Sequence, residues 1–152
     1  MVKLTIDGKV VEVPEGTTIL EAAQKAQLRI PTLCYLKDIN EIGACRVCVV
    51  ELEGSKQLVT ACNTAVQEGM TVRTASTRVR HARRMAVELM LTQHDSNCPT
   101  CPRNGNCKLQ NLARDLGVRD VRLNKEIPIQ RKDASTPSIV RDPKKCIMCY
   151  RC

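Results

Sequence analysis

The sequence predicts an α+β protein built from several small modules, in which a short sheet precedes a helical segment. Three observations support this prediction. Only 1% of the 152 residues are aromatic, which is too few rings for one large core. Ten cysteines could stabilise small modules by binding metal. Apolar residues follow the period of strands before residue 77 and the period of a helix after it.

The first segment is expected to form the sheet. Asp7-Gly8 is typical of a two-residue hairpin turn, and the residues on either side alternate in polarity. This pattern predicts paired strands at Val2–Ile6 and Lys9–Val13. Later runs of strand-forming residues predict further strands at Val47–Glu53, Gln57–Ala61 and Thr71–Thr74.

One helix is expected to cross this sheet. Thr18 and Glu21 fit a capping box, which opens a short helix that runs to about Ala26. A sheet in this order that wraps over one helix is the β-grasp arrangement. We therefore expect a β-grasp domain over residues 1–76.

Helices are expected beyond that domain. Apolar residues recur at helical spacing from Thr77 to about Thr92, and a second apolar stripe follows Cys107 and ends before Gly117. These helices define a small domain over residues 77–118. Residues 119–140 are polar and interrupted by prolines, which predicts an extended connection.

Four cysteines in the first segment are spaced C-x10-C-x2-C-x13-C, at Cys34, Cys45, Cys48 and Cys62. A 2Fe–2S cluster needs four thiolates, drawn here from a loop that curls around it and one distant ligand. Gly43-Ala44 keeps side chains small where backbone N–H groups must approach sulfide. Zinc is the alternative, because C-x2-C is common in zinc sites.

A second constellation is spaced H-x3-C-x2-C-x5-C, at His94, Cys98, Cys101 and Cys107. The cysteines lie in a loop rich in turn-forming residues between the two expected helices. Three cysteines need a fourth ligand, and His94 lies at the entrance of the loop, so we expect a 4Fe–4S cluster with one histidine ligand. Zinc is again the alternative, whereas His81 has no cysteine nearby and is expected to be solvated.

The third constellation, Cys146, Cys149 and Cys152, has the C-x2-C-x2-C spacing that begins a bacterial-type 4Fe–4S ferredoxin motif. Residues 141–152 are therefore expected to be the truncated start of such a domain. A further 4Fe–4S cluster could form there only if the chain continues or another segment supplies the missing ligand. We expect the sequence to be the front of a longer polypeptide.

The net charge and the N-terminal sequence argue against secreted, membrane-spanning and nucleic-acid-binding proteins. The N-terminus has no signal-peptide pattern and no apolar run is long enough to span a membrane, which predicts a cytoplasmic protein with metal-bound cysteines rather than disulfides. The net charge of +8 falls to roughly +5 when the cluster thiolates are counted. With almost no aromatic residues to stack on bases, nucleic-acid binding is only a weak alternative.

The order of these motifs resembles the N-terminal region of the large iron-only (FeFe) hydrogenases of the NAD(P)-linked or bifurcating type. It is also similar to the start of the large iron–sulfur subunit of respiratory complex I. The segments that look more hydrogenase-like are Arg103–Gln110 and Ser138–Cys146. The resemblance implies a continuation with two 4Fe–4S clusters and a catalytic H-cluster domain, so we expect no catalytic residue in this chain and no hydrogen turnover by it alone.

The resemblance and the motifs together predict the electron-relay arm of a multi-subunit hydrogenase, an oxidoreductase coupling reversible H2 oxidation to NAD(P) or ferredoxin. The expected partners are flavin- and NAD(P)-binding iron–sulfur subunits, or ferredoxin, in a hetero-oligomer. Two other classes stay open: a subunit of a complex I-like or formate-dehydrogenase-associated enzyme, and a zinc-binding interaction module. A basic helix face could be a docking patch for an acidic partner or only a solvated surface; it carries Arg78, Arg80, Arg83 and Arg84.

Overall fold

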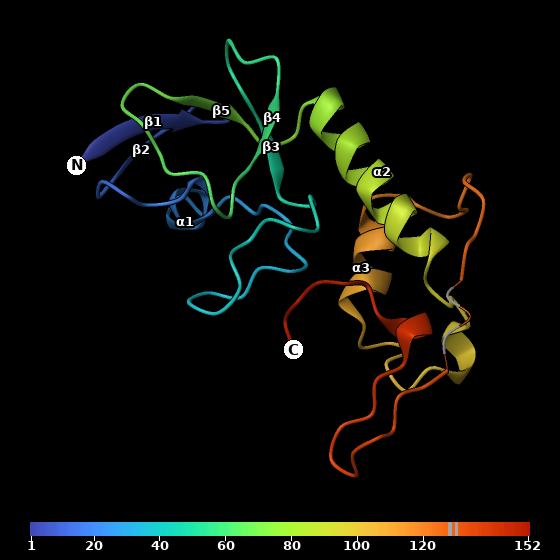
Figure 1. The fold of residues 1–152 in the computed structure, drawn as a ribbon. Helices are drawn as coiled ribbons and strands as arrows, with labels where there is room; N and C mark the ends of the chain where they lie inside the picture. Colours follow the sequence, from blue (N-terminus) through green and yellow to red (C-terminus); the bar gives the residue numbers. More distant parts are fainter. Residues whose placement is uncertain (128, 130) are drawn as a thin grey trace. The chain divides into compact units, whose positions relative to one another are not determined.

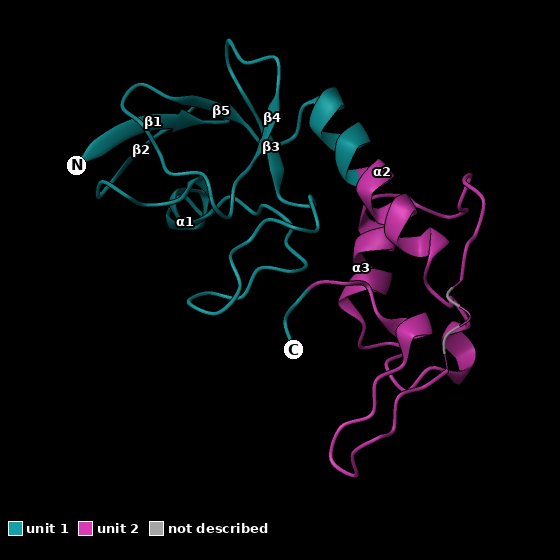
Figure 2. Cartoon of the chain, viewed as in Figure 1, with its two compact units in different colours: residues 1–83, 150–152 teal, residues 84–149 magenta. Residues whose placement is uncertain are grey.

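The computed structural model describes residues 1–127, 129 and 131–152, and the chain forms two compact units. Unit 1 comprises Met1–Arg83 and Tyr150–Cys152, and unit 2 comprises Arg84–Cys149 (Figure 2). The division falls inside helix α2, which spans Thr77–Thr92. Each unit is therefore described by itself.

Unit 1 is built on a five-stranded mixed sheet with the order β2-β1-β5-β3-β4 (Figure 1). The central strand β5 runs parallel to β1 and antiparallel to β3, and the outer pairs β1–β2 and β3–β4 are antiparallel. The strands are β1 (Val2–Ile6), β2 (Lys9–Val13), β3 (Val49–Leu52), β4 (Leu58–Thr60) and β5 (Thr71–Arg73).

Helix α1 (Ile19–Lys25) packs its apolar residues into the core of unit 1. Thr18 accepts a hydrogen bond from the Glu21 backbone N–H, and the Glu21 carboxylate accepts one from the Thr18 backbone N–H, so the expected capping box is present. The Leu20 N–H also donates to the Ala61 carbonyl at 2.9 Å. The start of the helix is thus tied to the residue that precedes Cys62.

Unit 2 contains the second half of α2, helix α3 (Lys108–Asp115) and two short 3-10 helices at Cys98–Thr100 and Pro143–Lys145. Leu109 and Leu112 on α3 are buried, and Gly117 follows the helix with a φ of 67°. This left-handed glycine is the helix stop that the sequence indicated. Within the described part of the chain, no helix is both long and apolar enough to cross a membrane.

The elements confirm the expected α+β class, and β1, β2 and α2 have the expected bounds. Strands β4 and β5 are shorter than expected by one residue at one or both ends, and β3 runs from Val49 to Leu52 rather than from Val47 to Glu53. Arg46 adopts a left-handed conformation with a φ of 54°, and the chain turns through Cys48 before it becomes extended. The two residues lost at the start of β3, Val47 and Cys48, belong to the loop that carries Cys45 and Cys48.

Candidate metal centres

The four cysteines of the first constellation are buried together in unit 1. Cys34, Cys48 and Cys62 are at most 1% exposed, and Cys45 is 9% exposed. All four are free thiols rather than disulfides. Four soft sulfur donors, buried together away from water, are the ligand set that a thiolate-ligated metal cluster requires.

Cys34 and Cys45 are held against each other by a reciprocal pair of hydrogen bonds. The backbone N–H of Cys34 donates to the Cys45 Sγ atom, and the N–H of Cys45 donates to the Cys34 Sγ atom, each at 3.5 Å. Backbone N–H groups that point at sulfur stabilise negative charge on it. The buried side chain of Asn40 supports the loop by donating to the Cys34 carbonyl at 3.0 Å.

Cys48 and Cys62 form the other pair, with their Sγ atoms 3.4 Å apart. Two thiolates on one tetrahedral metal with bonds of about 2.3 Å lie roughly 3.8 Å apart, so this separation is close to that of a shared metal. The hydrogen bond between the two side chains lowers the pKa of Cys48 to about 6, and the same contact raises the pKa of Cys62. Burial raises the pKa of Cys34 to about 11.

The loop conformation around these cysteines depends on a glycine. Gly43 has a φ of 66°, and a Cβ atom placed there would lie 3.1 Å from both the Asn63 Nδ2 and the Thr60 Oγ1 atoms. A larger residue would therefore be strained and crowded at once. The sulfur pairs, their N–H donors and this tight loop fit a 2Fe–2S cluster held as Cys34 with Cys45 and Cys48 with Cys62.

Arg83 is a functional candidate that the helical pattern wrongly assigned to the exposed face of α2. The expectation of an exposed side chain is wrong for this residue, because Arg83 is buried and its Nη2 donates to the Val49 carbonyl at 2.7 Å. Val49 directly follows Cys48. A sequence pattern gives no signal for this contact, because Arg83 lies among other arginines that remain exposed or half-buried.

The second constellation comes together in unit 2. One small cavity is lined by all four predicted ligands, His94, Cys98, Cys101 and Cys107. A second cavity, of about 640 Å³, shares His94, Cys98 and Cys107 with the first. The cavity that all four donors share is small, about 20 Å³, and Cys101 does not line the larger one.

The His94 side chain has the properties of a ligand in its neutral form. Its Nδ1 atom is buried and has no hydrogen-bond partner among the described residues. Burial, and then the positive charge of Lys145, lower the pKa of the imidazole. A neutral imidazole with an unpartnered nitrogen is the form that binds metals, so these residues fit a cluster with three thiolates and one histidine.

The cysteines of the third constellation are divided between the two units. Cys146 and Cys149 belong to unit 2 and Cys152 belongs to unit 1. The Met148 N–H donates to the Cys146 Sγ atom at 3.4 Å, and Met148 has a φ of 49°. Among the described residues, those of the first two constellations included, no three His, Cys, Asp or Glu side chains surround a single point where one metal ion could sit.

A salt bridge connects the segment before Cys146 to the second constellation. Lys145 Nζ lies 3.0 Å from the Asp95 carboxylate and donates to the Asp95 carbonyl at 2.7 Å, and the Asp95 N–H donates to the Lys144 carbonyl. Lys145 also lines the cavity of the four ligands. The Lys145 hydrogen bond lowers the pKa of Asp95, so that carboxylate is already engaged.

The remaining candidates sit on α2 or away from the cysteines. His81 is exposed, as expected. Arg78 pairs with Glu51 at 3.9 Å, and Arg84 pairs with Glu88 at 3.3 Å. Arg80 is exposed and donates to the Ala75 carbonyl at 2.7 Å.

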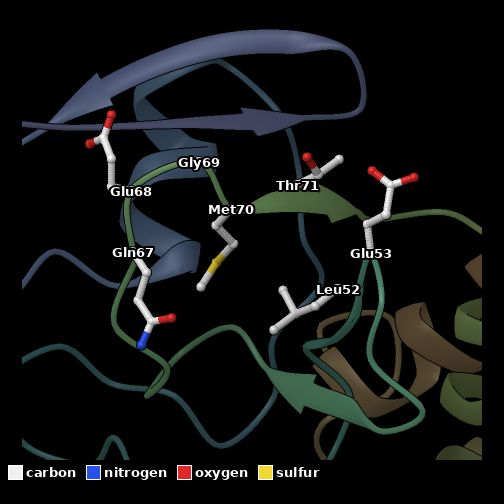
Figure 3. A pocket seen from close by; sticks show the side chains of 7 residues that line it. All are labelled: Leu52, Glu53, Gln67, Glu68, Gly69, Met70 and Thr71. Carbon is white, nitrogen blue, oxygen red and sulfur yellow. The ribbon is translucent and has the colours of Figure 1, made fainter.

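An open pocket on the sheet of unit 1 is formed by Leu52, Glu53 and the segment from Gln67 to Thr71 (Figure 3). Both of its carboxylates have partners, because Glu53 pairs with Arg73 at 3.0 Å and Glu68 accepts from the Lys3 backbone N–H at 2.8 Å. It contains no cysteine or histidine, and we assign it no chemistry.

Two family models match the chain. Residues 1–77 match the family described as 2Fe-2S iron-sulfur cluster binding domain. Residues 83–122 match the NADH-ubiquinone oxidoreductase-G iron-sulfur binding region. The two matches cover the first and second constellations, respectively.

Curated relatives and a solved structure agree with these matches. The chain is 48% identical, over its whole length, to the NADP-reducing hydrogenase subunit HndD of Solidesulfovibrio fructosivorans and spans 27% of that protein. It is 43% identical to the NADPH-Fe(3+) oxidoreductase subunit alpha of Geobacter sulfurreducens, and again its whole length spans only 18% of the relative. A crystal structure of an NAD+-reducing [NiFe]-hydrogenase in the H2-reduced state matches 97% of this chain and 62% of its own, with a TM-score of 0.89 and 34% identity.

Proposed function

The chain belongs to the family of 2Fe–2S iron–sulfur cluster binding domains through residues 1–77, and from this premise we propose that it is the electron-relay arm of a multi-subunit oxidoreductase. The observation that carries the proposal is the arrangement of four buried, free cysteines in two close pairs. Two reciprocal N–H···S bonds hold one pair, and a 3.4 Å Sγ–Sγ contact defines the other. Clusters of this kind transfer one electron at a time between fixed positions.

The chain's own residues supply the binding and the insulation. The four cysteines of the first site exclude water through their burial, and the N–H donors of the loop offset negative charge on sulfur. His94, Cys98, Cys101 and Cys107 would hold a second, 4Fe–4S cluster in unit 2. Cys146, Cys149 and Cys152 would hold a third only with a ligand from elsewhere.

We propose that unit 1, with its five-stranded mixed sheet and helix α1, is a β-grasp domain whose sheet holds the cluster loop as in 2Fe–2S ferredoxins. Residues 141–152 would begin a bacterial-type 4Fe–4S ferredoxin domain. The connection at 119–140 would then link the two cluster-binding segments.

A hydrogenase is the enzyme class that we favour for the whole protein. The relative with 48% identity is an NADP-reducing hydrogenase subunit, and the residues around Cys107 and before Cys146 are hydrogenase-like. An iron-only hydrogenase would couple H2 oxidation to NAD(P) or ferredoxin through flavin-binding partner subunits. A complex I-like subunit is the second candidate, because the second constellation matches the iron-sulfur region of NADH-ubiquinone oxidoreductase G.

Metal analysis tests the relay proposal. After anaerobic reconstitution, the chain should contain about 6 iron atoms and a matching amount of acid-labile sulfide, from one 2Fe–2S and one 4Fe–4S cluster. Cys62→Ser should remove the 2Fe–2S signal in electron paramagnetic resonance and leave the second signal in place. Cys107→Ser should do the reverse.

The zinc alternative makes the opposite prediction. A zinc module would be colourless, would contain stoichiometric zinc and would release almost no sulfide. The enzyme class is tested separately, by expressing the complete gene and its neighbours and assaying hydrogen uptake against NAD(P) and ferredoxin. Quinone-linked NADH oxidation without hydrogen uptake would favour the complex I-like candidate.

A further inference from the structure

Arg83 is a buried cation beside the first cysteine set. The residue is 6% exposed, and the one hydrogen bond of its side chain within the described part of the chain ties it to the carbonyl of Val49, the residue after Cys48. Its Nε atom is also buried and has no hydrogen-bond partner among the described residues. A guanidinium stays charged at any ordinary pH, so unit 1 contains a partly unsatisfied positive charge.

A buried charge is costly unless an opposite charge compensates it. Among the described residues, no carboxylate lies within ion-pair distance of Arg83. Burial lowers the pKa of Arg83, whereas the negative charges of Cys48 and Asp7 raise it. The Asp7 carboxylate is already engaged with Thr74, whose backbone N–H donates to it at 2.8 Å.

We infer that Arg83 is a tuning residue for the first cluster, and that its guanidinium raises the reduction potential of the 2Fe–2S centre. This inference rests on the proposed function, because the cluster supplies the missing negative charge. With four thiolates a 2Fe–2S core carries a charge of about −2 when oxidised and about −3 when reduced. A fixed positive charge nearby stabilises the more negative, reduced state to a greater extent.

A purely structural role is the competing explanation. Arg83 joins α2 to the start of β3 through the Val49 carbonyl, and this bond alone could account for its burial. The two roles differ in what they require. The structural role needs a hydrogen-bond donor, whereas the tuning role needs a positive charge.

Three substitutions separate charge from hydrogen bonding. Arg83→Gln keeps a donor and removes the charge, and Arg83→Lys keeps both a donor and the charge. Arg80→Gln is the matched control, because Arg80 is exposed and lies one turn away on α2. This substitution changes the net charge by the same amount as Arg83→Gln. Iron and sulfide content is measured first in each protein, so that loss of the cluster is distinguished from a change in its potential.

The readout is the midpoint potential of the 2Fe–2S signal in a redox titration followed by paramagnetic resonance. Arg83→Gln should shift it to a clearly lower potential, Arg83→Lys should stay close to the wild type, and Arg80→Gln should leave it unchanged. The Arg83→Gln shift should persist at high salt, because buried charges are screened much less than exposed ones. Equal midpoints in Arg83→Gln and Arg80→Gln, with full iron content, would overturn the inference.

A measurement on the unmutated chain covers the case in which Arg83→Gln fails to assemble a cluster. Arginine labelled with ¹⁵N only in its guanidino group should give a weak nitrogen coupling in pulsed paramagnetic resonance of the reduced 2Fe–2S cluster. The guanidino group of Arg46 in the cysteine loop carries the same label, so the coupling is measured again in Arg46→Lys, where a coupling from Arg83 should persist. Absence of any ¹⁵N coupling would place the guanidinium too far away and would also overturn the inference. If the wild type itself contains no iron and sulfide, the proposed function fails instead.

Discussion

The carboxylate of Glu88 on α2 is fully buried and accepts a two-point hydrogen bond from Arg122. Arg122 Nη2 lies 2.8 Å from Glu88 Oε2, and Arg122 Nε lies 3.1 Å from the same oxygen. Arg84 approaches the other oxygen at 3.3 Å. The connection after α3 is therefore fastened to α2 inside unit 2.

Arg122→Met should destabilise unit 2, because it removes one of the two guanidinium groups that pair with the buried carboxylate and leaves Arg84. We expect the melting temperature of the reconstituted chain to fall by several degrees. Melting is monitored through the visible absorbance of the second cluster. The exposed Arg119 provides the control, since Arg119→Met removes an equal charge from the same connection. Equal melting temperatures for the two variants would contradict the expected role of the pair.

The pH dependence of this effect follows from the direction of the shift. The hydrogen bond from Arg122 lowers the pKa of Glu88, so the stabilisation is present above the ordinary glutamate pKa of about 4.3 and is lost as the pH falls through the lower folded value. The stability difference between wild type and Arg122→Met should therefore be constant from about pH 8 to about pH 5. A difference that shrinks within this range would mean that Glu88 is not held ionised.

Gly43 tests whether the first cysteine loop is as tight as its geometry indicates. Gly43→Ala should cost about 1–2 kcal/mol for the left-handed conformation and about 1–3 kcal/mol more for crowding against Thr60 and Asn63. Gly54→Ala is the matched control, because Gly54 has a φ of 79° and open space at its Cβ position. The measurement is the rate at which the 2Fe–2S absorbance bleaches in guanidinium. Equal rates in the two variants would contradict the crowding argument.

Much of the fold follows from local signals in the sequence. Asp7-Gly8 and the polarity alternation gave the first hairpin with its observed bounds, and Thr18 with Glu21 gave the start of α1. Gly117 marked the end of α3. These signals succeed because each depends on residues within a few positions of one another.

The parts that sequence reasoning missed depend on contacts between distant residues. The burial of Arg83 requires a carbonyl 34 positions earlier, and the burial of Glu88 requires a guanidinium 34 positions later. A helical pattern treats both residues as members of a polar face. The cysteine and histidine sets could be proposed from spacing, whereas the pairing of Cys34 with Cys45 needed the hydrogen bonds of the folded loop.

The basic residues of α2 divide into two groups once their contacts are known. Arg84 is paired with buried Glu88 and Arg83 is itself buried, so a charge reversal at either would disturb the fold. Arg80 is exposed, and its side chain donates to neutral oxygens of Ala75 and Thr77. It is the residue through which a docking patch is best tested.

Arg80→Glu should slow reduction of the clusters by the physiological electron donor several-fold at low salt and leave the cluster spectra unchanged, because exposed charges act mainly on encounter rates. The difference from wild type should disappear as ionic strength rises. Lys9→Glu on the edge strand β2 is the control for an equal change in net charge. An unchanged reduction rate for Arg80→Glu at low salt would identify this helix face as a solvated surface.

His94 is the residue on which the second cluster depends most. Its Nδ1 atom is buried without a partner among the described residues, and its ring lines the same cavity as Cys98, Cys101 and Cys107. A neutral imidazole in place of a thiolate removes about one negative charge from the ligand set, which favours the reduced state.

His94→Cys should therefore retain the 4Fe–4S cluster and lower its potential, and His94→Ala should make the cluster labile because three protein ligands remain. The exposed His81 gives the control substitution, His81→Ala, which should change neither cluster. Redox titration followed by paramagnetic resonance would track the two signals separately.

If His94→Ala kept the spectrum and midpoint of the second cluster, Asp95 would be the next candidate ligand. Its carboxylate would first have to leave Lys145, which lies 3.0 Å away. If Asp95 is the ligand, Lys145→Met should free its carboxylate and strengthen its bond to the cluster. If His94 is the ligand, Lys145→Met should leave the iron content of the second site unchanged.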